Sequence, residues 1–199
     1  MSDARDDDWE REALRLGQRY IDEVVLGFGL CPWAEAALRG GRVARAVCLS
    51  QAPVAADCLP AVSAFLAARA PEVDIGLLSF PRAEVGWAAF DGFAERVRRA
   101  HGSQGPFLIA AFHPDGPERP HNPDQAVSFF RRTPDPMLQF VRAELIDRLK
   151  ASQPEASAGV GLRNFRTMGG DGVAHLNAVI ANIRADRDAA YAALALHRG

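Results

Sequence analysis

The sequence predicts an α/β protein: a single-domain sandwich, residues 1–199, in which several helices flank a small sheet of three or more strands. Two observations predict this class. Amphipathic stretches with helical spacing alternate along the chain with short apolar runs of strand length. The alternation is not interrupted by an internal repeat or by a linker long enough to separate two domains. The order and the direction of the strands are left open.

Apolar residues at intervals of three and four mark the expected helices. The first begins at Trp9, after a polar tail at residues 1–8 that we expect to be disordered, and ends at the glycines of residues 27–29. Residues 152–172 are rich in turn formers and are expected to be a mobile loop. The other expected helices cover residues 33–40, 54–70, 83–100, 137–151 and 173–196.

Three short apolar runs, residues 42–49, 73–80 and 107–112, are the expected strands. The third ends abruptly at His113 and opens into a polar, proline-rich loop that reaches Pro136. Strand ends that open into polar loops are common ligand-binding places in open α/β proteins. We therefore expect the functional site at this loop.

Composition narrows the class of partner. Hydrophobic residues make up 48%, charged residues 24%, and the net charge is −2, which gives no electrostatic reason to expect nucleic acid or an anionic membrane. No apolar run approaches the roughly 18 residues that span a bilayer. The first residues are acidic, unlike a signal peptide, and the three cysteines show no paired spacing. We expect a cytoplasmic protein whose partner is a small molecule.

Three short blocks carry a resemblance to a known family. They are Gly-Phe-Gly-Leu-Cys-Pro-Trp-Ala at residues 27–34, Phe-His-Pro at 112–114, and Arg-Thr-Pro-Asp-Pro-Met-Leu at 132–138. In order and spacing they resemble blocks of an uncharacterised bacterial family, domain of unknown function 1415. The resemblance implies a shared site but brings no known reaction. The family often has asparagines where this chain has Ser128 and Arg131, which implies a different ligand if those asparagines bind one.

One residue from each block is a candidate for catalysis. Cys31 can be a nucleophile, a redox centre or a soft metal ligand if the start of a helix or a nearby cation lowers its pKa; the alternative is a buried, inert cysteine. His113 can act as a general acid or base, or ligate a metal or haem iron; the alternative is a histidine that bonds loop backbone. Arg132 can bind a carboxylate or phosphate; the alternative is an internal ion pair.

Other residues of the loop and of the following segment are expected to assist. Two arginine side chains near the start of a helix after Pro136 would suit an anionic ligand. The expected substrate-binding residues are Arg131, Arg142, Asp124 and Thr133.

His113 and His121 are the candidate metal ligands. Each has an aspartate close by in the sequence, Asp115 and Asp124, and such a set suits a borderline metal such as zinc or iron. No recognised ligand spacing is matched. The cofactor that these residues would hold is haem or a transition metal.

Two functions follow for a site built by Cys31, His113 and Arg132. The leading one is an enzyme that acts on a small polar or anionic molecule, either through a metal-free Cys/His pair or as a metal- or haem-dependent oxidoreductase. The alternative is a non-catalytic protein that binds a small ligand or regulates through it. An interaction domain that exposes its tryptophans is disfavoured, because all three tryptophans fit helical core stripes.

Overall fold

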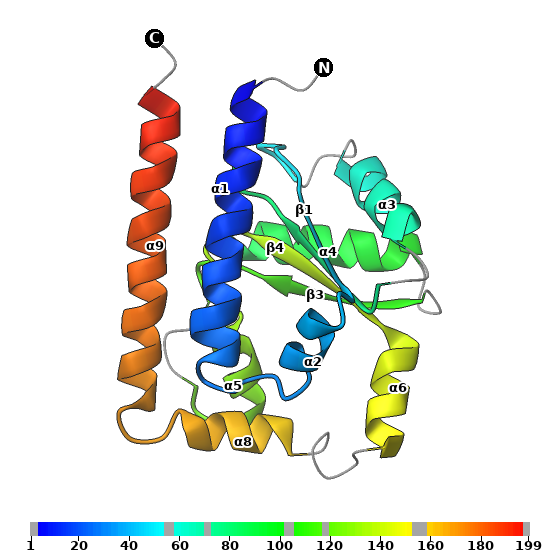
Figure 1. The fold of residues 1–199 in the computed structure, drawn as a ribbon, viewed down its shortest axis with the longest axis vertical. Helices are drawn as coiled ribbons and strands as arrows, with labels where there is room; N and C mark the ends of the chain where they lie inside the picture. The colour runs from blue at the N-terminus through cyan, green and yellow to red at the C-terminus, as the bar shows by residue number, and fades with distance from the viewer. Residues whose placement is uncertain are drawn as a thin grey trace.

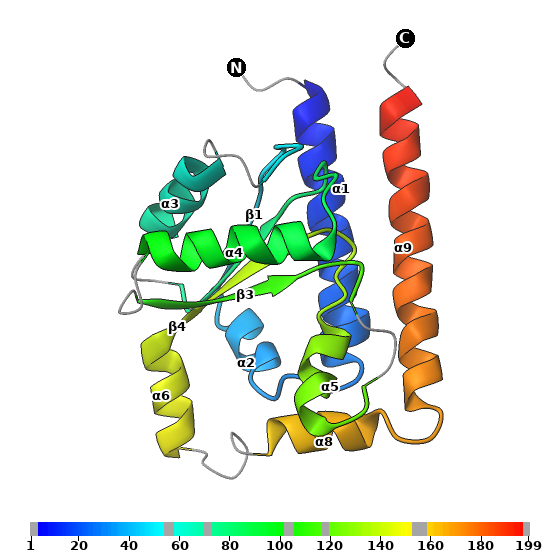
Figure 2. The ribbon, with the colours of Figure 1, turned by 180° about the vertical axis from the view of Figure 1, so that it is seen from behind.

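The protein is described by a computed structural model that covers residues 4–53, 58–69, 73–101, 106–116, 120–152 and 159–196. Its centre is one open, four-stranded sheet with the strand order β1-β2-β4-β3. Strands β1 (Val43–Val47) and β2 (Ile75–Ser79) are parallel, and β4 (Met137–Arg142) runs antiparallel to both β2 and β3 (Phe107–Phe112). Helices flank both faces of this mixed sheet (Figures 1 and 2). The predicted α/β class is confirmed.

Helices α3 (Cys58–Arg69) and α4 (Trp87–His101) cover one face of the sheet, as Figure 2 shows for α4. Alternate residues of a strand point to the same face, so this face receives every second strand residue. Gly76 of β2 allows a close approach here, because a Cβ atom at this position would lie 2.8 Å from the ring of Phe65. The buried strand residues of this core are Ala44, Leu78, Ala111, Leu138 and Phe140.

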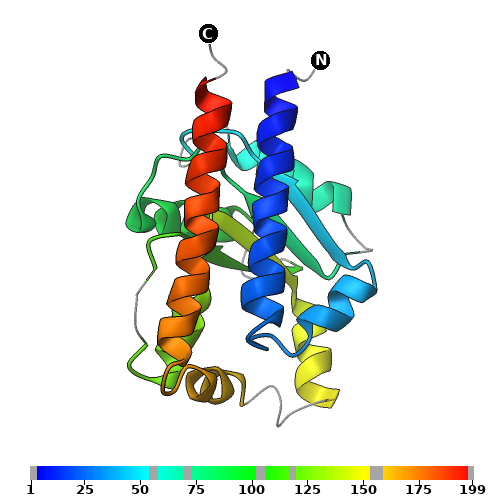
Figure 3. The ribbon, with the colours of Figure 1, turned by 60° about the vertical axis from the view of Figure 1, so that its left-hand side comes forward.

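The opposite face lies beneath α1 (Ala4–Tyr20), a π-helical continuation η1 (Ile21–Leu26) and the short helix α2 (Ala34–Arg39). The alternate strand residues pack here, including Leu77 and Met137 against η1. Helix α9 (Gly172–Leu196) runs antiparallel beside α1, so both ends of the chain lie at the same end of the molecule (Figures 1 and 3). Among the described residues, no helix is long and apolar enough to cross a membrane.

Helix α5 (Pro123–Phe130) lies within the segment that was expected to be a loop. Its first turn is capped by Asn122, whose side chain accepts a hydrogen bond of 2.8 Å from the backbone N–H of Gln125. Asparagine at this position and proline directly after it are both favourable at the start of a helix. Helix α8 (Val160–Thr167) packs against α5 below α9 (Figure 1).

Three further expectations are corrected. Residues 137–142 form strand β4 rather than the start of a helix, and the helix α6 (Ala143–Ser152) begins only afterwards. Residues 4–8 belong to α1, so the expected disordered tail is wrong for these residues. The expected loop at 152–172 contains α8. Strand β3 has the expected bounds, and the other expected elements are present with shifted ends. Residues 54–57 and 70 of one expected helix lie outside the described residues.

Candidate functional site

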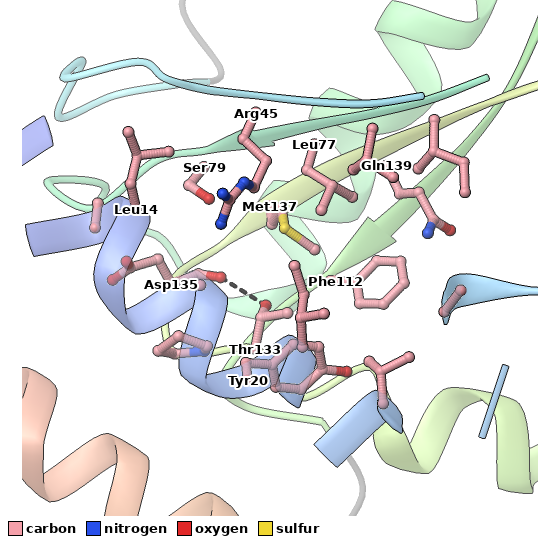
Figure 4. A pocket seen from close by; sticks show the side chains of 18 of the residues that line it. Leu14, Tyr20, Arg45, Leu77, Ser79, Phe112, Thr133, Asp135, Met137 and Gln139 are labelled. Atoms are coloured by element: carbon pink, nitrogen blue, oxygen red, sulfur yellow. Dashed lines mark hydrogen bonds between the residues drawn. The ribbon is translucent and has the colours of Figure 1, made fainter. Parts of the chain in front are cut away.

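A cavity of about 100 Å³ lies between α1, α2 and the face of the sheet beneath them (Figure 4). Most of its wall is apolar and includes Leu14 from α1 and Leu77, Phe112 and Met137 from three strands. The space exists partly because α1 carries Gly17 at this level. A Cβ atom at Gly17 would meet nothing within 4 Å, so no side chain of the helix fills this part of the gap.

Arg45 of β1 is the cationic group on this apolar wall, and its side chain is exposed to solvent. It shares the inner face of its strand with Val43, and Figure 4 shows its guanidinium beside Met137. The guanidinium donates a hydrogen bond to Gln18 Oε1 on α1. It forms no ion pair with a carboxylate among the residues that the structure describes. The remaining polar wall residues include Ser79 and Gln139.

Cys31 lies on the wall of the same cavity and is half-buried. Burial raises the pKa of its thiol, while hydrogen bonds from backbone groups of Trp33 and Ala34 and the charge of Arg163 act in the opposite direction without cancelling the effect. The thiol is therefore protonated at neutral pH. A protonated thiol is a poor nucleophile and a poor metal ligand.

His113 is buried at the end of β3 and is not part of the cavity wall. Its Nδ1 accepts a hydrogen bond of 3.0 Å from the backbone N–H of Asp115, so the proton of the neutral ring resides on Nε2. Nε2 donates to the carbonyl oxygen of Val85 at 2.9 Å, and the rings of Trp87 and Phe90 pack beside the imidazole. Both ring nitrogens are thus hydrogen-bonded to backbone groups. This is the alternative to a catalytic role, a histidine that bonds loop backbone at the end of a strand.

Arg132 is also buried, and it too is absent from the cavity wall. Its Nε donates to the carbonyl oxygen of Phe129 at 2.9 Å, and its Nη2 donates to Asn177 Oδ1 on α9. The guanidinium lies 4.4 Å from the centre of the Phe129 ring. These contacts join α5 to α9. The structure therefore does not bring Cys31, His113 and Arg132 together around one cavity.

The three blocks that carry the family resemblance nevertheless meet at this cavity. The first contributes Cys31, the second Phe112, and the third the run from Thr133 to Asp135 with Met137. A family model described as "Protein of unknown function (DUF1415)" matches residues 12–178. The chain belongs to the DUF1415 family. No curated protein and no solved structure matches it. All cavity-wall residues of this DUF1415 chain, from Ala13 to Gln139, lie inside the matched region.

The expected substrate-binding residues of the DUF1415 chain are dispersed. Arg131 stacks over the Phe112 ring at 5.3 Å, and burial lowers the pKa of its guanidinium. Arg142 ends β4, rather than beginning a helix, and donates to the carbonyl oxygen of Val73. Of the expected residues whose side chains are described, only Thr133 lines the cavity, where its hydroxyl donates to the backbone oxygen of Asp135 at 2.6 Å.

The described residues do not provide the expected metal site. His121 is exposed, and its backbone N–H bonds Gln125 Oε1, whereas the side chain of Asp124 lies outside the described part of the chain. Within that part, no group of three or more histidine, cysteine, aspartate or glutamate side chains could hold a metal ion. His113 also has no ring nitrogen available for a metal or haem iron. The side chains of His113 and His121 therefore do not fit a bound haem or transition metal, the cofactor expected from the sequence.

Asp135 is the charged residue of this region that we did not identify as a site residue from the sequence. It lines the cavity, but its carboxylate accepts hydrogen bonds from Arg187 Nε at 2.9 Å and from the Tyr191 hydroxyl at 2.7 Å, both on α9. Burial raises the pKa of this carboxyl group, against the opposing effects of Tyr191 and Arg187. These hydrogen bonds join the part of the cavity wall that carries Asp135 to α9.

Asn164 of α8 provides a first prediction. The residue is fully buried, and neither its Oδ1 nor its Nδ2 has a hydrogen-bond partner among the described residues. A buried polar group without a partner costs about 1–3 kcal/mol, so Asn164→Leu should raise the free energy of unfolding by that order, as measured by urea denaturation. The exposed Asn182, which accepts a bond from Arg19, is the control, and Asn182→Leu should bring no gain. A loss of stability in Asn164→Leu would show that the amide has a buried partner.

Proposed function

We propose that this DUF1415 protein binds a small amphipathic anion, a carboxylate with an apolar body, in the cavity between α1 and the sheet. The observation that carries the proposal is Arg45, a guanidinium on an apolar wall with no carboxylate partner among the described residues. A guanidinium offers two parallel N–H groups to a carboxylate. The apolar body would lie against Leu77, Phe112 and Met137, as in most small-molecule sites, where few polar groups orient a largely apolar ligand.

The contacts of Cys31, His113 and Arg132 favour a protein that binds its ligand without catalysis. They disfavour the enzyme that the sequence predicts. The Cys31 thiol is held protonated by burial. Both nitrogens of His113 bond the backbone, and Arg132 bonds Phe129 and Asn177. A general base must reach a substrate proton, and His113 does not line the cavity in which that substrate would lie. We therefore favour a ligand-binding or regulatory role.

Calorimetric titration with octanoate tests the proposal, with 1-octanol as the uncharged probe of the same chain length. Arg45→Gln should weaken octanoate binding by up to about fivefold, because Arg45 is exposed and an exposed ion pair contributes at most about 1 kcal/mol. It should leave the affinity for octanol unchanged. Arg39→Gln removes an exposed arginine of α2 that is absent from the cavity wall, and should leave both affinities unchanged.

Two results would contradict the proposal. If the wild-type protein bound neither probe, the cavity would not be a site for amphipathic anions. If Arg45→Gln bound octanoate as tightly as the wild-type protein does, Arg45 would not be the anion-binding group.

A further inference from the structure

Gln139 of β4 is a second polar group on the wall of the cavity between α1 and the sheet. Its side chain is half-buried and has no hydrogen-bond partner among the residues that the structure describes. Its amide atoms keep accessible surface, so a molecule in the cavity can reach them. An amide that a ligand covers without bonding loses its water and gains no partner, which is unfavourable. A ligand that fits this cavity should therefore carry a hydrogen-bonding group for Gln139.

The register of the sheet fixes where Gln139 lies relative to Arg45. Leu77 of β2 pairs with Arg45 on one side and with Gln139 on the other, so the three side chains form one row across the sheet, with Leu77 in the middle (Figure 4). Neighbouring strands are about 4.8 Å apart and side chains stand roughly perpendicular to the sheet, so about 10 Å separates the two polar groups.

The two ends of this row differ in their exposure. Arg45 lies on the edge strand β1 and is exposed, whereas Gln139 lies on the inner strand β4 and is half-buried. The row therefore runs from solvent toward the inside of the molecule and crosses an apolar residue on the way. A ligand that follows it has a charged end, an apolar middle and an uncharged polar end.

We infer that the ligand is an amphipathic carboxylate with a hydroxyl group at the far end of its chain. This inference rests on the proposed function, in which the carboxylate pairs with Arg45. The amide of Gln139 offers both a donor and an acceptor, which matches a hydroxyl group, since a hydroxyl also both donates and accepts. An extended chain with bonds of about 1.5 Å covers the row in about eight bonds, the number between the carboxyl carbon and the hydroxyl oxygen of 8-hydroxyoctanoate.

Calorimetric titration of the full chain compares 8-hydroxyoctanoate with octanoate. The wild-type protein should bind 8-hydroxyoctanoate about fivefold more tightly, because its hydroxyl gains one hydrogen bond that the methyl end of octanoate leaves unmade. The probe 5-hydroxyoctanoate carries its hydroxyl in the middle of the chain, over Leu77. It should bind more weakly than octanoate, because that hydroxyl is covered without a partner.

Gln139→Leu should remove the preference for the hydroxylated probe. Leucine continues the apolar wall, so octanoate should bind this variant at least as tightly as 8-hydroxyoctanoate does. Gln51→Leu, which replaces an exposed glutamine that is absent from the cavity wall, is the matched control and should keep the wild-type preference.

Two results would overturn the inference. The first is a wild-type protein that binds octanoate as tightly as 8-hydroxyoctanoate, a result that leaves the proposed function intact. The second is a preference for 8-hydroxyoctanoate that persists in folded Gln139→Leu, which would assign the hydroxyl group to another wall residue such as Ser79. A wild-type protein that binds neither compound would contradict the proposed function itself, and this inference with it.

Discussion

Replacement of Asp135 by alanine is expected to lower the free energy of unfolding by about 3 kcal/mol. The Asp135 carboxylate is buried and accepts hydrogen bonds from Arg187 and Tyr191. Its removal leaves a partly buried guanidinium without its main counter-charge and a buried hydroxyl without an acceptor. Urea denaturation at neutral pH measures the loss.

The control is Asp188, an exposed carboxylate of α9 that pairs with the same Arg187. Asp188→Ala should change the stability by less than about 0.5 kcal/mol, since surface ion pairs contribute little. The double variant Asp135→Leu with Arg187→Leu should recover part of the loss, because replacing both members of a buried pair avoids the isolated charge. Equal losses in Asp135→Ala and Asp188→Ala would show that burial of the carboxylate does not matter.

His113→Ala should lower the free energy of unfolding by about 3 kcal/mol and should leave ligand affinity unchanged in the folded fraction. The substitution removes a buried ring that packs beside Trp87 and Phe90, together with its bonds to Asp115 and Val85. Denaturant titration measures the stability, and calorimetry with octanoate measures the affinity.

The exposed His121 is the matched control, and His121→Ala should be neutral within about 0.5 kcal/mol. His113→Gln should retain more stability than His113→Ala, because the glutamine amide can still donate to the Val85 carbonyl. A stable His113→Ala protein that has lost octanoate binding would instead place His113 in the ligand site.

The fold was largely predictable up to residue 112, because each strand there is a short apolar run separated from the next by an amphipathic helix. Strand β3 has the predicted bounds, Phe107–Phe112. Helix α5 was missed although the sequence contains its signal, since Asn122, Pro123 and Gln125 are the residues expected at the first positions of a helix. The polar composition of the loop obscured this start.

Strand β4 was predicted as a helix because two adjacent elements combine into an apparent helical pattern. Leu138 and Val141 belong to the strand, whereas Leu145 and Leu149 belong to α6, yet their spacing of three and four residues is that of one helix. A central strand that is covered on both faces has apolar residues throughout and loses the alternation that identifies a strand. The sequence alone does not show that 137–142 is central.

The location of the site was predicted in part. Cys31 and Thr133 line the cavity, whereas His113 and Arg132 are held in the surrounding structure. Arg45 was missed, although it shares a face of its strand with the apolar Val43 and Val47; its side chain is exposed rather than buried. A charged residue at such a position is a signal that the sequence does contain. Its lack of a carboxylate partner could be seen only in the structure.

The most direct test of the central claim compares octanoate binding in Gly17→Leu and Gly17→Ala by calorimetric titration. Gly17 lines the cavity between α1 and the sheet and has open space where its side chain would be. Both substitutions favour the helix, by about 1 kcal/mol for alanine, so both variants should fold. If the cavity is the binding site, the leucine side chain should fill it and abolish binding, while the alanine variant binds as the wild-type protein does. Octanoate affinity that is unchanged in folded Gly17→Leu would contradict the claim.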